Sequence, residues 1–165
     1  MAPAAPTSRA LRAEPMVRGP TLRLVALDRE GLGVISAHAQ NTCVKRSEMA
    51  WLPAQRRFVV AGMRYDWVGA KTGPAERVGS VLRFDRVQKV SHLGLDDVGK
   101  DGTFNLLAVA FEKTDPPAGM IFLAFADGAL VRLQVECVEA ELRDIGPREV
   151  AEACAGHALT ETSAV

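Results

Sequence analysis

The side chains best suited to acid–base or nucleophilic chemistry near neutral pH, histidine and cysteine, are few and far apart in this sequence. They are three histidines and three cysteines: His38, His92, His157, Cys43, Cys137 and Cys154. Cys43 stands just before Lys45 and Arg46, whose positive charges could lower the pKa of its thiol. A nucleophilic pair of Cys43 with His38 or His92 is therefore one hypothesis. Because cysteine more often serves as a small buried packing residue, we favour a protein that is not an enzyme.

No short motif points to a cofactor, a metal ion or a known reaction. The sequence contains no glycine-rich dinucleotide loop, phosphate-binding loop, serine-hydrolase elbow or paired-histidine zinc motif. It also lacks a Cys-x-x-Cys pair and a cysteine–histidine cluster, which argues against a disulfide framework and a zinc site. The acidic stretch from Asp96 to Asp101 lacks the ligand order of a calcium-binding loop, so we expect a solvated turn there. We therefore predict neither a metal nor a cofactor.

A binding surface is the second hypothesis, and its candidates lie in and near residues 48–67. This stretch, EMAWLPAQRRFVVAGMRYDW, holds both tryptophans and the only tyrosine of the chain. If the strands that carry Arg64 and Arg83 are neighbours, the two guanidinium groups could share one face and clamp a carboxylate or phosphate. Tyr65 and Trp67 lie near a strand end, where aromatic rings can border a pocket. We therefore predict Arg64, Arg83, Tyr65 and Trp67 as ligand-binding residues.

The same residues also have a purely structural interpretation. Tyr65 and Trp67 continue an alternating apolar face, which is typical of cross-strand core packing. That face begins with Val59, Ala61 and Met63. The two arginines could instead point outward and pair with Asp66 and Asp85.

Length and composition describe an ordinary globular protein. The chain has 165 residues, of which 48% are hydrophobic and 24% charged, enough to bury a core in one domain. Lys+Arg and Asp+Glu both total 20, so no net charge attracts the chain to nucleic acid or to an anionic membrane. Exposed stacking aromatics are not evident either. Nucleic-acid binding through the basic strands is therefore the weakest alternative.

The ends of the chain and its compartment are also predicted from composition. Residues 1–19 are rich in Ala, Pro and Arg and lack a hydrophobic signal-peptide core, so we expect a disordered tail, with Met16 as an alternative start. One domain is expected over residues 20–159 and a loose end over 160–165. An odd number of widely spaced cysteines favours the cytoplasm. The longest apolar runs are too short to cross a membrane, so we expect no membrane association.

The order of structural elements follows from the periodicity of apolar residues. A first strand is expected over residues 20–27, and Asp28 can cap a helix over 28–41. From residue 42 the apolar period changes to two, which predicts a meander of antiparallel strands. The expected strands are 44–52, 57–68, one or two within 76–95, 103–113, and two within 120–142.

Two later signals complete the prediction. The pair Asp127-Gly128 suits a type I′ hairpin turn, and the strand that follows would place Cys137 on its buried face. Gly146-Pro147 is typical of a helix start, which predicts a helix over 147–158. These elements together predict an α+β fold: an antiparallel, strongly bent sheet, sandwich or incomplete barrel of about six to eight strands, with one helix after the first strand and a C-terminal helix. A pleckstrin-homology-like barrel is one candidate.

Three segments together resemble an uncharacterised family of alphaproteobacterial proteins, a domain of unknown function. They are EMAWLPAQRRFVVAGMRYDW, LRFDRVQKVSHLGL and ADGALVRLQVECVEAELRDIG. The resemblance implies a small cytoplasmic bacterial protein with no assigned activity, and it carries over no functional residues.

The function expected from the sequence is a non-enzymatic cytoplasmic domain that binds a protein partner or a small anionic ligand. An enzyme with a scattered cysteine–histidine site is the alternative. An unpaired sheet edge would also allow a homo-oligomer to form.

Overall fold

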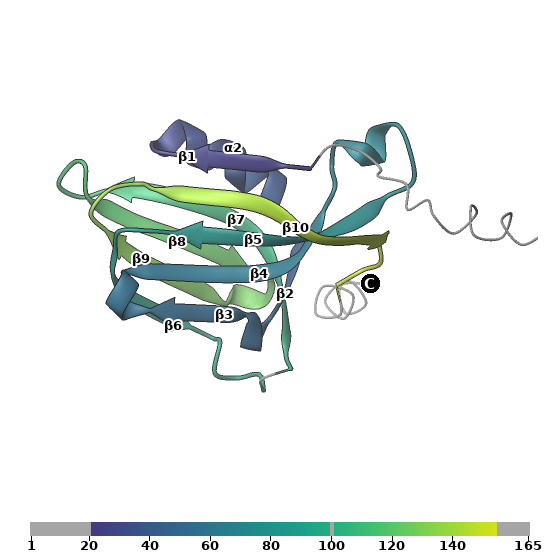
Figure 1. Cartoon of the computed structure of the whole chain (residues 1–165). Coiled ribbons are helices and arrows are strands. Elements are labelled where there is room, and N and C mark those ends of the chain that lie inside the picture. The colour runs from purple at the N-terminus through teal and green to yellow at the C-terminus, as the bar shows by residue number, and fades with distance from the viewer. Residues whose placement is uncertain (1–20, 100, 155–165) are drawn as a thin grey trace, which may run out of the picture.

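The computed structural model describes residues 21–99 and 101–154, and over these ranges it contains ten strands and one α-helix (Figure 1). The strands are β1 (Arg23–Ala26), β2 (Thr42–Lys45), β3 (Met49–Leu52), β4 (Arg57–Tyr65), β5 (Glu76–Phe84), β6 (Val87–Leu93), β7 (Thr103–Lys113), β8 (Gly119–Phe125), β9 (Leu130–Val135) and β10 (Ala140–Val150). The helix is α2 (Arg29–Ala39). Four short 3₁₀ turns, η1 (Arg46–Glu48), η2 (Pro53–Gln55), η3 (Gly69–Lys71) and η4 (Ala126–Gly128), complete the described chain. The predicted tail at 1–19, Met16, His157 and the end at 160–165 lie outside these residues.

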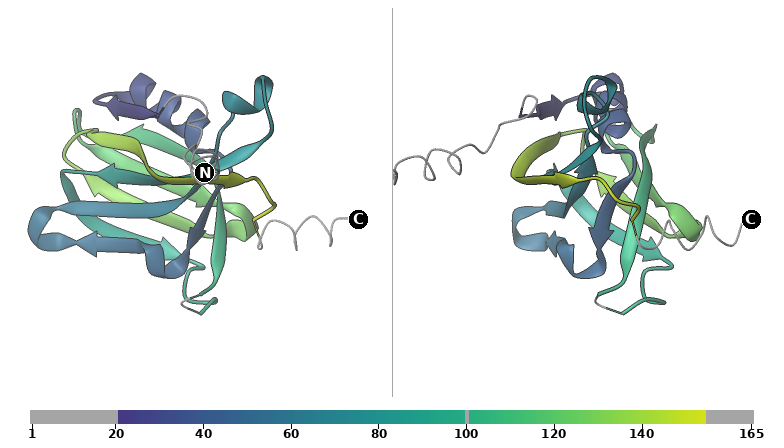
Figure 2. Two further views of the ribbon diagram at one scale, coloured as in Figure 1. Left: turned by 45° about the vertical axis from the view of Figure 1, so that its right-hand side comes forward. Right: turned by 90° about the vertical axis from the view of Figure 1, so that its right-hand side faces the viewer.

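All ten strands belong to one antiparallel sheet. Its order is β1-β10-β5-β4-β2-β7-β8-β9-β6, and β3 adds to β4 beside β2. The sheet curls on itself, so that β3 and β6 lie near each other at the lower left of Figure 1. The views in Figure 2 show α2 and β1 together across the top of this curl. No helix within the described residues is long and apolar enough to cross a membrane.

The helix begins where its cap predicts. The Asp28 side chain accepts a hydrogen bond from the Gly31 N–H at 2.8 Å, which satisfies one of the unpaired donors of the first turn. Leu32, Ile35 and Ala39 form the buried stripe of the helix. This stripe packs on β7 and β1 and closes one end of the core.

The predicted fold class is wrong in the number of strands and in the C-terminal helix. Two segments expected as single strands divide in two: 44–52 divides at η1, and the second half of 120–142 divides after Val135. Residues 76–95, for which one or two strands were expected, form two. Arg86 adopts a left-handed φ of 63°, which turns the chain between β5 and β6. The structure is one ten-stranded sheet, so the prediction of a pleckstrin-homology-like barrel of six to eight strands with a C-terminal helix is wrong.

The helix predicted over 147–158 does not form in its described part, residues 147–154. Instead β10 continues through Gly146 and Pro147 to Val150, with a register shift between Asp144 and Arg148. Proline cannot donate a hydrogen bond, and this shift leaves Pro147 unpaired in the ladder between β10 and β5. Residues 155–158 of that prediction lie outside the described chain.

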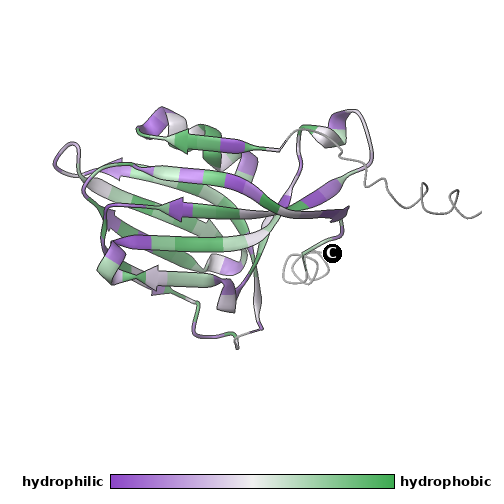
Figure 3. Ribbon diagram, viewed as in Figure 1, coloured by the Kyte–Doolittle hydropathy of each residue, from purple (hydrophilic) through white to green (hydrophobic). Residues whose placement is uncertain are grey.

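The core lies inside the curl, and the inward face of β4 is the reverse of the predicted one. Phe58 and Val60 are buried, whereas Val59 and Ala61 on the other face remain partly exposed. Consecutive residues of this strand are apolar (Figure 3), so both of its faces carry apolar side chains and alternation alone did not identify the inner one. Strands β8 and β9, in the opposite half of the sheet, contribute five side chains that are 0% exposed: Ile121, Leu123, Val131, Leu133 and Val135.

The β8–β9 hairpin turns at Asp127-Gly128 as predicted. Asp127 and Gly128 take consecutive left-handed φ values of 69° and 85°, as the two central residues of a type I′ turn do, and the Phe125 N–H donates to the Ala129 carbonyl oxygen across the three-residue connection. Cys137, however, follows the end of β9 and is partly exposed, so its predicted burial is wrong.

Candidate functional site

The curled sheet is open between β3 and β6. Within the described chain, β3 pairs only with β4, and β6 pairs only with β9. The two edges meet at one end, where the Val87 N–H donates to the Arg56 carbonyl oxygen at 2.9 Å. Away from that bond a cavity of about 270 Å³ lies between them, which we call the β3–β6 cleft. Its lining residues are Arg46, Met49, Trp51, Phe58, Val90, His92, Leu95 and Val131.

The walls of the β3–β6 cleft consist of inward-facing residues from both edges. Trp51 lies opposite Phe58 in the β3–β4 ladder, and His92 lies opposite Val131 in the β6–β9 ladder. Because directly paired residues project to the same face, Trp51 and His92 both point toward the interior of the curl. Phe58 and Val131, 4% and 0% exposed, form an apolar floor.

The mouth of the cleft is basic. The Arg46 side chain is 31% exposed, and its only described ion pair is a 3.4 Å contact with Asp96, whose side chain is 79% exposed. A long contact between solvent-exposed charges is weak, so an anionic group in the cleft can compete for this guanidinium. His92 is exposed at the same opening. The cleft therefore combines an apolar floor with a cationic entrance.

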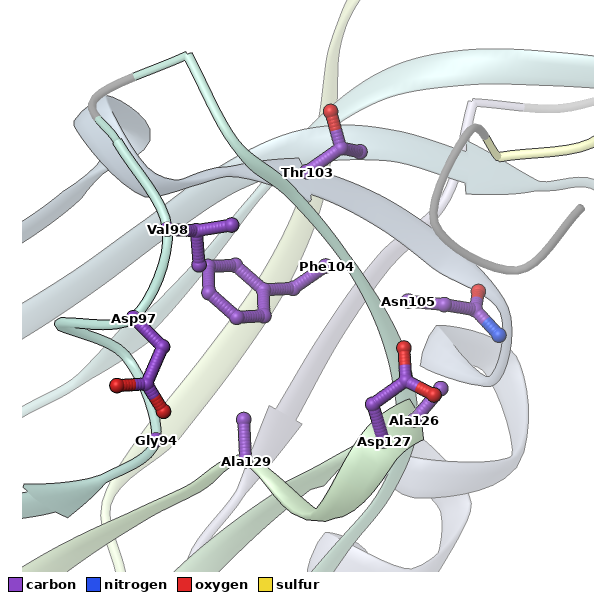
Figure 4. A pocket seen from close by; sticks show the side chains of 9 residues that line it. All are labelled: Gly94, Asp97, Val98, Thr103, Phe104, Asn105, Ala126, Asp127 and Ala129. Atoms are coloured by element: carbon purple, nitrogen blue, oxygen red, sulfur yellow. The ribbon is translucent and has the colours of Figure 1, made fainter. Parts of the chain in front are cut away.

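A second cavity of similar size, about 270 Å³, lies between the 94–98 loop and η4 (Figure 4). Phe104 and Ala129 contribute apolar surface, but its charged lining residues are both aspartates, Asp97 and Asp127. Such a lining repels anions, which makes this cavity the poorer match to the anionic ligand expected from the sequence.

Arg64, a predicted ligand-binding residue, is inside the protein in a buried ion pair. Its guanidinium donates to Asp144 through Nε at 3.0 Å and Nη2 at 2.9 Å, and the two side chains are 3% and 4% exposed. The Ser80 hydroxyl and the Leu22 N–H donate to the same carboxylate at 2.7 and 2.9 Å. This network holds β4, β5, β10 and the residue before β1 together, and the buried Arg64 guanidinium is paired with Asp144.

The same network predicts a pH dependence of stability. Burial alone would raise the pKa of Asp144, but hydrogen bonds from Arg64, Ser80 and Leu22 outweigh burial and hold the pKa below its ordinary value of 3.8. A lowered carboxyl pKa adds stability that is fully present above pH 3.8 and is lost as the pH falls toward the lower folded-state value. We expect the free energy of unfolding, measured by urea titration, to fall steeply below about pH 4. The Asp144→Asn variant should show a shallower fall, and an unchanged slope would contradict this role.

Arg83 points the opposite way from Arg64. It lies opposite Val59, whereas Arg64 lies opposite Val78, so the two arginines are on different faces of the β4–β5 pair. On the outer face Arg83 contacts both Asp85 and Glu141 at 3.0 Å. The structure therefore does not assemble the predicted two-arginine clamp.

Tyr65 and Trp67 are brought together, but far from Arg83. Their ring centroids are 4.5 Å apart, and the Arg77 guanidinium lies 5.9 Å above the Tyr65 ring. The Trp67 indole N–H donates to the Gln40 carbonyl oxygen at 3.0 Å. Tyr65 and Val59 are six residues apart on β4, so this group lies roughly 20 Å from Arg83. It packs the connection between α2 and β2 against the far end of β4.

The candidate catalytic residues occupy three separate places. Cys43 forms a disulfide with Cys154, with Cα atoms 5.4 Å apart, and so has no thiol for nucleophilic attack in this state. His92 lines the β3–β6 cleft, and His38 lies in the last turn of α2. Among the described residues, no group of three His, Cys, Asp or Glu side chains could hold a metal ion. The arrangement offers no assembled cysteine–histidine pair.

Sequence reasoning included His92 but missed Arg46, Trp51 and Val90 as residues of one cleft. The placement of Met49 and Trp51 on one strand face was the available signal. The curl that brings β3 beside β6 could not be predicted from the sequence, because these two strands do not pair with each other.

Fold and site together describe a protein built on a curled antiparallel sheet with a ligand-sized apolar cleft at its open edge. The chain belongs to the family described as Protein of unknown function (DUF2948), whose model matches residues 22–157. Comparisons with curated proteins and with solved structures found no match.

Proposed function

We propose that this protein is a non-enzymatic binding domain, and that the β3–β6 cleft holds a small ligand with an apolar body and a carboxylate or similar anionic end. The observation that carries the proposal is the combination of an apolar floor with Arg46 and His92 at the mouth. Ligand sites are commonly apolar cavities with a small number of polar groups that fix orientation.

The size of the cleft limits the ligand. At roughly 30 Å³ per non-hydrogen atom, a volume of about 270 Å³ accommodates on the order of ten atoms. A medium-chain carboxylate such as octanoate has this size and polarity. Its chain would lie over Phe58 and Val131, and its carboxylate would replace Asp96 as the partner of Arg46.

Two alternative functions, an enzyme and a domain that binds a protein, each have a structural requirement. A cysteine–histidine enzyme would first need the disulfide at Cys43 to open. A protein partner or a second copy of the chain could add to the unpaired edges of β3 or β6. The proposed compartment is the cytoplasm, where the disulfide between Cys43 and Cys154 would be exposed to reducing thiols.

Calorimetric titration with octanoate tests the proposal. We expect a dissociation constant of about 0.1–1 mM for the wild type, typical of a ligand of this size. Loss of a charge-assisted hydrogen bond in Arg46→Gln should weaken binding about tenfold. Asp96→Asn should strengthen binding, because it removes the competing carboxylate.

The matched control is Arg132→Gln, on the outer face of β9, where Arg132 donates to Ser91. It should leave octanoate binding unchanged. Equal binding of uncharged octanol, or equal weakening by Arg132→Gln, would contradict a cleft that selects an anionic end.

A further inference from the structure

The Cys43–Cys154 disulfide borders a third cavity, on the outer face of the sheet. This outer groove has a volume of about 420 Å³ and lies between β2, β4, β5 and the bulge of β10. Met63, Ile145 and Pro147 supply apolar surface, and Cys43 and Lys45 line the β2 side. Cys43 is partly exposed and borders the groove, which is the side from which an incoming thiol could approach the disulfide.

The other sulfur is enclosed. Cys154 is 3% exposed, and its Sγ lies 3.7 Å from the Phe104 carbonyl oxygen. The segment that carries it is held by two hydrogen bonds: the Ala151 N–H donates to the Ala75 carbonyl oxygen at 3.0 Å, and Arg77 Nε donates to the Glu152 carbonyl oxygen at 2.9 Å. The two bonded cysteines therefore differ in exposure: Cys43 is partly exposed and Cys154 is buried.

From this asymmetry we propose that the outer groove is a thiol–disulfide exchange site, at which a small thiol of the glutathione class attacks Cys43 and displaces Cys154. Reactivity in exchange depends on which sulfur an incoming thiolate can reach. Of the two bonded cysteines, Cys43 lines the groove and Cys154 does not. Lys45, on the same face of β2, can hold the negative end of the incoming thiol, and Glu48 lines the same groove and limits how much negative charge it accepts.

The exchange balances as a two-electron reduction. A thiolate RS⁻ attacks Cys43 Sγ, an RS–Cys43 bond forms, the Cys43–Cys154 bond breaks, and the electron pair leaves on Cys154, which takes a proton from solvent. A second thiolate attacks the RS sulfur, which releases RSSR and the Cys43 thiolate. Two small thiols are thereby oxidised to one disulfide, and the protein disulfide is reduced to two cysteines. The reverse reaction, with RSSR as oxidant, restores the disulfide.

After protonation, the Cys154 sulfur has a hydrogen-bond acceptor within reach. The Cys154 thiol formed by the first step can donate its hydrogen to the Phe104 carbonyl oxygen. Cys137 takes no part in the disulfide and is partly exposed, so it has to be removed before the two reacting cysteines are compared.

The test uses Cys137→Ser protein in its disulfide form, mixed with reduced glutathione, stopped with acid at short times, and analysed by peptide mass spectrometry. We expect glutathione on Cys43 to exceed glutathione on Cys154 by about tenfold or more. Equal labelling, or an excess on Cys154, would overturn the proposal.

A second comparison uses a variant whose new side chain fills the groove. Ala61 lines the outer groove on β4, so Ala61→Phe should slow formation of the Cys43–glutathione adduct several-fold. The matched control, Val59→Phe, adds the same ring to the same outer face of β4 at a position that does not line the groove, and it should leave the rate unchanged. Equal rates in Ala61→Phe and wild type would show that the thiol does not enter through the groove.

Discussion

Replacement of Arg64 by alanine is expected to lower the free energy of unfolding by about 3–5 kcal/mol. The substitution would leave the Asp144 carboxylate buried, 4% exposed, without its bidentate partner. The cost arises from this uncompensated charge, since a buried ion pair can itself be close to neutral relative to apolar residues. Urea unfolding of the variant, followed by circular dichroism, measures the change.

Arg83→Ala is the control for that prediction. Arg83 is 38% exposed on its side chain, and its partners keep other arginines: Asp85 contacts Arg57, and Glu141 contacts Arg23. We expect a loss of less than about 1 kcal/mol for this variant. Equal losses for the two arginines would contradict the assignment of Arg64 as the buried structural partner of Asp144.

Reduction of the Cys43–Cys154 disulfide is expected to have the second large effect. The bond joins residues 111 positions apart, and a loop of that length restricts the unfolded chain enough to stabilise the folded state by about 4–5 kcal/mol in the chain-entropy model. We expect the urea midpoint of the wild type to fall on addition of a reductant.

Two variants separate this effect from general sensitivity to reductant. Cys43→Ser should have the lower midpoint with or without reductant, because it cannot form the bond. Cys137→Ser should behave as the wild type does. A wild-type midpoint that does not change on reduction would show that the disulfide does not contribute this stability.

Local sequence signals predicted local structure well. Asp28 caps α2 through Gly31, and Asp127-Gly128 makes the β8–β9 turn. Each signal depends on a conformation that a side chain or a glycine favours within a few residues. The C-terminal prediction was wrong because Gly146-Pro147, which is typical of a helix start, here occupies a bulge in β10 whose form is set by pairing with β5.

The site was harder to predict because it depends on contacts between strands distant in sequence. The faces of β4 could not be told apart by polarity, since the inward face carries Arg64 and the outward face carries apolar residues such as Val59. The partner that makes Arg64 structural, Asp144, lies 80 residues away. The expectation of no disulfide is wrong for the same reason, because Cys43 and Cys154 lie 111 residues apart in the sequence.

The most direct measurement of the account's central claim is the fluorescence of Trp51 during titration with octanoate. The chain has two tryptophans, so Trp67→Phe leaves Trp51, in the wall of the β3–β6 cleft, as the only reporter. We predict a saturable change in Trp51 emission with octanoate and none with octanol, and a curve shifted about tenfold to higher concentration by Arg46→Gln. Octanoate binding detected by calorimetry without a change in Trp51 emission would place the ligand outside the cleft and contradict the account.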